Sequence, residues 1–302
     1  MPDSRRGLLL GAAAYTLWGV FPLYWTVLEP AGAIELLAHR IVWSLVTMLL
    51  ILVIWRRVGR LRALFSDRRK LLLLSSAAVV ISVNWGGYIW GVNNGRVVET
   101  SLGYFINPLV TVLMGVLILG ERLRRLQWVA MAVALVAVVV LAIDYGRPPW
   151  VALVLAFSFG TYGLLKKQAA VEAVESITLE TIVMAPLALA YVAWLGTTGQ
   201  SNFASHGTGH ALLFTTTGII TAVPLMLFGA AAIRVSMVSL GLLQYLAPTI
   251  QFALGLLVFH EAMPASRWIG FGLVWVALAI FTIEAINHRR RQLRLVAHAS
   301  AA

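Results

Sequence analysis

Polar residues enter an otherwise apolar chain at Asn93-Asn94-Gly95-Arg96-Val97-Val98-Glu99-Thr100-Ser101-Leu102-Gly103-Tyr104-Phe105-Ile106-Asn107-Pro108-Leu109. This segment leads into a long apolar stretch that ends at Gly120-Glu121-Arg122. A similar pattern returns later, from Arg234 to Pro248 and then at His260-Glu261. Broken helices that recur within one membrane chain are typical of transporters. The repeated pattern therefore predicts a transport pathway rather than a packed soluble core.

The composition is that of a membrane protein with several spans. The 302 residues are 60% hydrophobic and only 12% charged, whereas soluble domains contain about 25% charged residues. The chain has no cysteine, which excludes disulfides, thiolate metal sites and cysteine nucleophiles. Its net charge is +11. Because the basic residues lie between apolar segments, we expect them to set the orientation of the chain in a membrane rather than to bind nucleic acid.

Ten apolar segments are long enough to cross a bilayer, which takes roughly 20 residues per helix. They are apolar around most of their circumference, which favours burial in lipid. The first follows Arg5-Arg6 like a signal peptide, but its apolar run is too long and lacks a small-residue cleavage site, so we expect an uncleaved span. The expected spans are 7–28, 34–55, 71–92, 99–119, 127–144, 149–165, 177–196, 211–232, 238–259 and 268–286.

The basic residues are distributed unequally between the two sides of these spans. If both termini lie on one side, that side holds 19 of the 23 basic residues. The other side holds Arg96, Arg147 and Arg267, and Arg40 lies within a span. Loops rich in Lys and Arg stay in the cytoplasm, so the asymmetry predicts that both termini are cytoplasmic. It also favours an even number of spans.

The second half of the chain repeats the first. A shift of 140 positions matches spans 3–5 with spans 8–10 without a gap. Each half therefore contains five spans, and an odd number means that the second half enters the membrane from the opposite side. We expect an inverted repeat of units 7–144 and 149–286, followed by a basic cytoplasmic tail at 287–302. The matched pairs are Leu102 with Leu242, Pro108 with Pro248, Gly115 with Gly255, Glu121 with Glu261 and Trp128 with Trp268.

Several short motifs spread over residues 5–288 resemble one transporter family. The chain is similar to the RarD family of EamA-type transporters, in the drug/metabolite transporter superfamily. The resemblance implies ten transmembrane helices as two inverted five-helix EamA repeats around a central cavity. It also implies alternating-access export of small metabolites or drugs across the bacterial cytoplasmic membrane. The motifs are Trp18-Gly19, Glu35-Leu-Leu-Ala-His39-Arg40, Val92-Asn93-Asn94, residues 101–109, Gly120-Glu121-Arg122-Leu123, and residues 157–163, 177–181, 244–249 and 275–281.

Three ionisable residues, Glu35, His39 and Arg40, lie within the second span. Glu35 and His39 are four residues apart, so they share a helix face and can pair. Ionisable residues inside a membrane usually face a water-filled cavity, which predicts a substrate or proton site near the outer side. The alternative is a structural ion pair near the interface, with Arg40 extending outward; Arg40 is about 10 Å into the span by helix rise.

Amide and aromatic side chains form a stripe along the third span and its end, at Asn84, Trp85, Tyr88, Asn93 and Asn94. A cavity lined by rings and a few amides suits a drug-sized organic ligand. An interfacial aromatic belt with hydrogen bonds between helices would give a similar pattern. Asn84 lies too deep for a belt, so both interpretations stay open.

Prolines interrupt the fourth and ninth spans. Pro108 removes the amide that would bond the carbonyl of Tyr104, so this carbonyl needs another partner, such as Asn107, water or a ligand. A kink needed only for packing is the alternative. The same arrangement in both halves favours a pair of broken helices that face the transported molecule. The ninth span repeats it with Gln244, Tyr245 and Pro248.

Further candidates lie near the ends of spans. Glu121 and Glu261 follow spans 4 and 9 on opposite sides of the membrane. Glu121 could stabilise the first turn of span 5 or pair with Arg124 or Arg125; substrate contact and a gate salt bridge are the alternatives. Glu180 could face the cavity or the interface. Trp18 and Tyr162 could stack on an aromatic substrate. In the second half, His260 replaces the glycine that often precedes this glutamate in the superfamily, which removes a helix C-cap.

Motifs for other chemistry are absent from the sequence. It contains no phosphate-binding loop and no His-Glu-x-x-His or Gly-x-Ser-x-Gly motif, so we expect no catalytic residues, no cofactor and no metal. The expected partners are a small-molecule substrate and the lipid bilayer, without nucleic acid, and spans 5 and 10 could form a homodimer contact. Two other functions stay open: a membrane-embedded transferase, and a sensor or scaffold that moves no solute.

Overall fold

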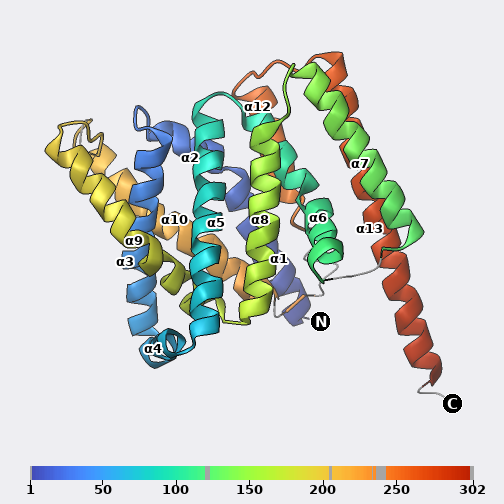
Figure 1. The fold of residues 1–302 in the computed structure, drawn as a ribbon, viewed down its shortest axis with the longest axis horizontal. Coiled ribbons are helices and arrows are strands. Elements are labelled where there is room, and N and C mark those ends of the chain that lie inside the picture. Colours follow the sequence, from blue (N-terminus) through green and yellow to red (C-terminus); the bar gives the residue numbers. More distant parts are fainter. Residues whose placement is uncertain (1, 120–122, 204–205, 233, 236–242, 300–302) are drawn as a thin grey trace.

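The computed structural model describes residues 2–119, 123–203, 206–232, 234–235 and 243–299, and within these ranges all regular structure is helical (Figure 1). This confirms the predicted all-α class. Helices satisfy their backbone groups internally, as a chain in lipid must. They are α1 (Pro2–Gly19), α2 (Phe21–Val27), α3 (Ala33–Ile54), α4 (Val58–Ser66), α5 (Arg68–Asn93), α6 (Val97–Leu119), α7 (Arg125–Asp144), α8 (Trp150–Ala169), α9 (Ala173–Thr197), α10 (Thr208–Ala232), α12 (Leu246–Leu257) and α13 (Ala265–Ala299).

Eight of the described helical stretches are long and apolar enough to cross a membrane. The chain is therefore a multi-pass integral membrane protein. Two shorter apolar helices, α8 and α12, coincide with the predicted spans 149–165 and 238–259. Part of the latter span, residues 238–242, lies outside the described residues. Crossing by all ten segments stays a prediction.

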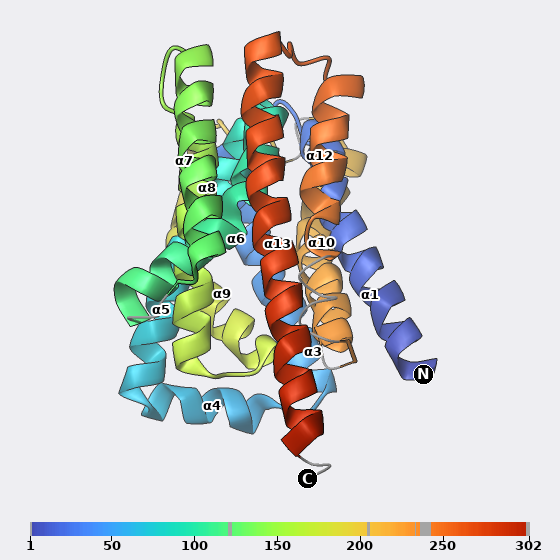
Figure 2. The same cartoon turned by 90° about the vertical axis from the view of Figure 1, so that its right-hand side faces the viewer.

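Connections between helices lie at two ends of the molecule (Figures 1 and 2). We call the end with α4 and both termini the basic end, and the end with the α5–α6, α7–α8 and α12–α13 connections the far end. Two elements differ from expectation. The short helix α4 was not predicted; it buries Leu61 and Leu64 and exposes Arg60 and Arg62. Helix α13 also continues to Ala299, through most of the predicted tail.

Polar contacts at helix ends show that three packed pairs of helices run in opposite directions. At the far end, Glu261 after α12 binds the first turn of α6, and Arg267 at the start of α13 binds Asp144 at the end of α7. Near the basic end, Glu172 before α9 binds Arg57 after α3 at 2.5 Å. Each pair also packs side by side: α6 with α12, α7 with α13, and α3 with α9.

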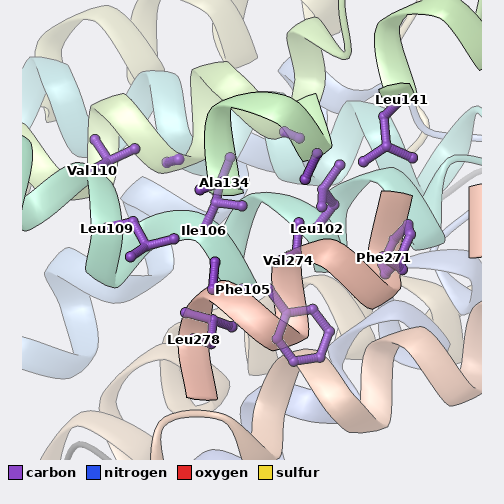
Figure 3. Packing of buried hydrophobic residues seen from close by; sticks show 14 of the residues in the cluster. Leu102, Phe105, Ile106, Leu109, Val110, Ala134, Leu141, Phe271, Val274 and Leu278 are labelled. Carbon is purple, nitrogen blue, oxygen red and sulfur yellow. The ribbon is translucent and has the colours of Figure 1, made fainter. Parts of the chain in front are cut away.

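Buried side chains of α6, α7 and α13 gather in one apolar cluster at an edge of the bundle (Figure 3). Elsewhere helices meet through glycine. A Cβ on Gly218 of α10 would lie 2.1 Å from the carbonyl oxygen of Trp43 in α3, and one on Gly255 of α12 would lie 2.6 Å from Val98 Cγ2 in α6. These close approaches pack α10 tightly on α3 and α12 tightly on α6. A larger residue at Gly218 would meet backbone and push the helices apart, whereas at Gly255 the shortest contact is with a side-chain methyl that can shift.

Candidate functional site

Arg40 lies in the interior, enclosed by aromatic rings. Its side chain does not extend to the surface, since the residue is only 4% exposed. The guanidinium carbon lies 4.0 Å from the ring centre of Trp85, 5.3 Å from that of Trp25 and 5.9 Å from that of Phe21. Its Nε donates a 3.1 Å hydrogen bond to Thr221 Oγ1. No carboxylate forms an ion pair with Arg40 in the part of the chain that the structure describes.

Four helices build this enclosure. Helix α3 supplies Arg40, α2 supplies Phe21 and Trp25, α5 supplies Trp85, and α10 supplies Thr221. The spacing of four residues places Phe21 and Trp25 on one face of α2, toward the core. The result is a cation held by ring faces, which attract it electrostatically.

Tyr88, Tyr104 and Asn84 lie beside this enclosure. Tyr88 is 3% exposed, and its hydroxyl has no hydrogen-bond partner among the described residues. Its ring meets that of Tyr104 edge-on at 5.7 Å. Tyr104 donates to Asn84 Oδ1 at 3.3 Å, and Asn84 Nδ2 donates to Leu155 O and Ser158 Oγ on α8. Asn84 thus ties three helices together, whereas the Tyr88 hydroxyl is unpartnered.

Glu35 and His39 contact the α9–α10 connection instead of each other. Glu35 accepts a 2.6 Å hydrogen bond from the backbone amide of Asn202 and a 2.8 Å bond from its side chain. His39 stacks on Phe203 at 5.0 Å, and its Nε2 is buried without a partner among the described residues. The expected pairing of Glu35 with His39 is therefore not formed, because the loop satisfies the carboxylate.

Glu180 is fully engaged near the basic end. It forms a 2.7 Å ion pair with Lys166, accepts from Ser176 at 2.7 Å and accepts from Tyr162 at 3.1 Å. The carboxylate side chain is 5% exposed. Because Glu180 forms its ion pair with Lys166, it does not serve as a counter-ion for Arg40.

The two prolines occupy different positions. Pro108 lies inside α6, and Asn107 Oδ1 beside it is buried without a partner among the described residues. Within the part of the chain that the structure describes, Asn107 makes no hydrogen bond to the carbonyl of Tyr104, which Pro108 leaves without its helical partner. Pro248 lies in the first turn of α12, where a missing amide costs no helical hydrogen bond. Gln244 and Tyr245 precede this turn and are half-buried.

The remaining amide and aromatic candidates make single hydrogen bonds to backbone carbonyls or through them. Trp18 accepts a 3.1 Å hydrogen bond at its carbonyl from Gln251 of α12. Asn93 donates to the carbonyl of Ala31 at 3.4 Å, and Asn94 bonds a carbonyl of its own helix at 2.8 Å. None of the three is among the rings that lie over the Arg40 guanidinium, which are those of Phe21, Trp25 and Trp85.

At the far end, Glu261 joins the α12–α13 connection to the start of α6. Its carboxylate accepts hydrogen bonds from the amides of Val97 and Val98, the latter at 3.0 Å. A carboxylate there satisfies free amides and the positive end of α6. Burial raises the pKa of Glu261 to about 7, against the opposing effects of these amides and Arg267. Glu121, its predicted counterpart, lies outside the described residues.

A charged cavity of about 240 Å³ surrounds this contact. One wall is the 2.7 Å ion pair of Arg147 with Glu99, which is 2% exposed. Another is Arg96, which lies 4.8 Å from the ring centre of Trp90.

Some residues of these sites were not predicted from the sequence: Phe21, Trp25, Thr221 and the Glu99–Arg147 pair. The four-residue spacing within α2 could have indicated Phe21 and Trp25.

The fold and these contacts define a multi-pass helical membrane protein with a buried arginine in its interior and polar contacts between helices near its ends. Residues 5–143 match the model of the EamA-like transporter family. Protein RarD of Streptomyces exfoliatus is 60% identical over 96% of this chain and 92% of its own length. The uncharacterized transporter YojE of Bacillus subtilis is 43% identical over 95% of this chain and 97% of its own.

A crystal structure of a protein with 18% sequence identity shares the fold, with a TM-score of 0.60 over 92% of this chain and 98% of the other. The chain belongs to the RarD family of EamA-type transporters, in the drug/metabolite transporter superfamily. Its relatives are named as transporters, which favours a membrane transporter over an enzyme.

Proposed function

We propose that this protein is a secondary transporter that exports small organic metabolites or drugs across the bacterial cytoplasmic membrane by alternating access. In this proposal both termini are cytoplasmic and the basic end faces the cytoplasm. The inner and outer openings form in turn at the two ends of an inverted pair of five-helix repeats.

The observation that carries the proposal is the packing of equivalent helices in opposite directions. A shift of about 140 residues relates α6 to α12 and α7 to α13, and these are the helices that pack together. The packing of α1 on α10 likewise has its counterpart in that of α8 on α5. Such a pseudo-two-fold arrangement supports an inverted repeat, in which one half can rock against the other around a fixed site.

Polar contacts near both ends fit this mechanism. At the far end, Glu261 joins the α12–α13 connection to α6. Toward the basic end, Lys166 of α8 joins Glu180 of α9. Contacts that open in turn are what alternating access requires. Proton coupling is a separate proposal, for which His39 is the candidate because its Nε2 is buried without a partner among the described residues.

Export can be tested in strains that differ only in this gene. The released solutes of a deletion strain and a complemented strain are compared by mass spectrometry. We expect at least one solute to accumulate outside only with the intact gene; equal profiles would instead favour a sensor or scaffold. Proteoliposomes with and without a pH gradient then test coupling, and identical accumulation in both would exclude it.

A further inference from the structure

We propose that Arg40, Tyr88 and Trp25 form the binding site for a carboxylate or phosphate group, so that the transported solutes are organic anions with an aromatic or apolar body. This inference rests on the proposed transport function and names its substrate class.

The first step is the charge of Arg40. A charged side chain in a membrane interior normally pairs with an opposite charge or with carbonyl groups. Glu35 is bound by the α9–α10 connection and Glu180 by Lys166. Arg40 has one hydrogen bond, to a neutral threonine, and ring faces around it. Among the described residues the interior thus contains a cation without a counter-ion.

The second step is the set of unused donors near this cation. The Tyr88 hydroxyl and the Trp25 Nε1 are both buried without a partner among the described residues. Trp25 lies 5.3 Å from the guanidinium carbon, and Tyr88 packs in the same buried cluster as Phe21 and Trp25. An indole N–H and a guanidinium can only donate, and a tyrosine hydroxyl can also donate. Such a site suits a group that only accepts, which is an anion.

The third step is the wall of the site. Phe21, Trp25 and Trp85 present rings to Arg40, and Tyr104 packs on Tyr88. Rings of this kind would contact the body of a solute while its anionic group takes the donors. On binding, the anion would replace part of the contact between the guanidinium and Trp85. A planar guanidinium also binds carboxylate and phosphate through two bonds, which lysine cannot do.

The test compares export by the wild type and by Arg40→Gln, Arg40→Lys, Tyr88→Phe and Trp25→Phe in the full-length chain. Arg60→Gln is the control, because this arginine lies on α4 with a side chain that is 63% exposed. We expect the solutes that depend on the wild-type gene to carry a carboxylate or phosphate. Losing a hydrogen bond to a charged group should lower their export about tenfold in Tyr88→Phe and Trp25→Phe, and about a hundredfold or more in Arg40→Gln.

The outcomes separate this inference from the proposed function. Export of neutral or cationic solutes, or unchanged anion export by Arg40→Gln, would overturn the anion site and leave the transporter intact. Absence of any gene-dependent export would overturn both.

A second readout separates binding from folding. An uncompensated buried charge is retained for function at the expense of stability. Arg40→Met should therefore raise the melting temperature of the purified protein in detergent while it abolishes anion export. A lower melting temperature in Arg40→Met, together with export retained in Tyr88→Phe and Trp25→Phe, would show that Arg40 is structural.

Discussion

The carboxylate of Glu261 lies 3.0 Å from the backbone nitrogen of Val98 and accepts its hydrogen bond. The two residues belong to opposite halves of the chain, so this contact ties the end of α12 to the start of α6. A contact between halves at one end is where an alternating-access protein would open.

We expect this contact to respond to pH. Burial raises the pKa of Glu261 to about 7 in the closed contact, whereas a hydrated glutamate has a pKa of about 4.3. Glu261 in the closed contact therefore holds its proton more tightly than a hydrated glutamate does, so protonation stabilises the contact. This stabilisation is fully present below the pKa of the hydrated glutamate and is lost as the pH rises through about 7. A thiol-reactive probe should therefore label Ala262→Cys faster relative to a reference cysteine at about pH 8 than at about pH 5.

The reference is Gln200→Cys, an exposed far-end position outside the contact. The added variant Glu261→Gln keeps a hydrogen-bond acceptor but cannot ionise. It should remove the pH dependence of the labelling ratio. An unchanged pH dependence in Glu261→Gln would assign the effect to another group.

The Lys166–Glu180 pair is expected to stabilise the fold. Lys166→Met leaves Glu180 buried without its cation, which costs about 3 kcal/mol in comparable cases. We expect a clear fall in the melting temperature of the purified protein. The double variant Lys166→Met with Glu180→Gln should recover most of it, because no charge is then stranded. Equal losses in the single and double variants would show that the pair is not coupled.

The span pattern could be predicted because bilayer thickness imposes the length of each apolar run. Helix α3 follows the predicted span 34–55 closely. Helix α4 could not be found this way, since nine amphipathic residues give no span signal. The continuation of α13 to Ala299 was also missed, because hydropathy ends a span where a helix can still continue in water.

The sequence indicated several candidate residues, but it did not indicate which residues contact them. Arg40 stood out as a charge inside a span, but its surroundings come from α2, α5 and α10. The partner of Glu35, Asn202, lies 167 positions away. His39 was closer in sequence, yet it forms no bond with Glu35. Such long-range choices depend on helix packing, which a local pattern does not contain.

Close packing of α10 on α3 predicts a sharp difference between two glycines of one helix. A Cβ at Gly218 would lie 2.1 Å from Trp43 O, whereas one at Gly229 would meet no atom within 4 Å. Gly218→Ala should lower the free energy of unfolding by about 1–3 kcal/mol through overpacking. Gly229→Ala should be neutral or stabilising by up to about 1 kcal/mol. Thermal unfolding in detergent measures both, and similar stability of the two variants would contradict the packing.

The orientation can be tested in the natural cysteine-free background. Arg60→Cys marks the basic end and Ala262→Cys marks the far end. A membrane-impermeant maleimide on intact cells should label only Ala262→Cys, because we place the basic end in the cytoplasm. Permeabilised cells provide the control, in which both should react. Labelling of Arg60→Cys in intact cells would reverse the orientation.

Alternating access is tested most directly by locking α6 to α12 with a disulfide. A Cβ on Gly255 would lie 2.6 Å from Val98 Cγ2. Because Cγ2 is one bond from the Val98 Cβ, the two Cβ atoms would lie within about 4 Å of each other, as a disulfide requires. Export of the gene-dependent solutes is measured in Val98→Cys with Gly255→Cys after oxidation and again after reduction, with both single variants as controls. We predict that oxidation stops export only in the double variant and that reduction restores it. Full export by the oxidised, cross-linked protein would contradict the account, because the far end would then not need to open.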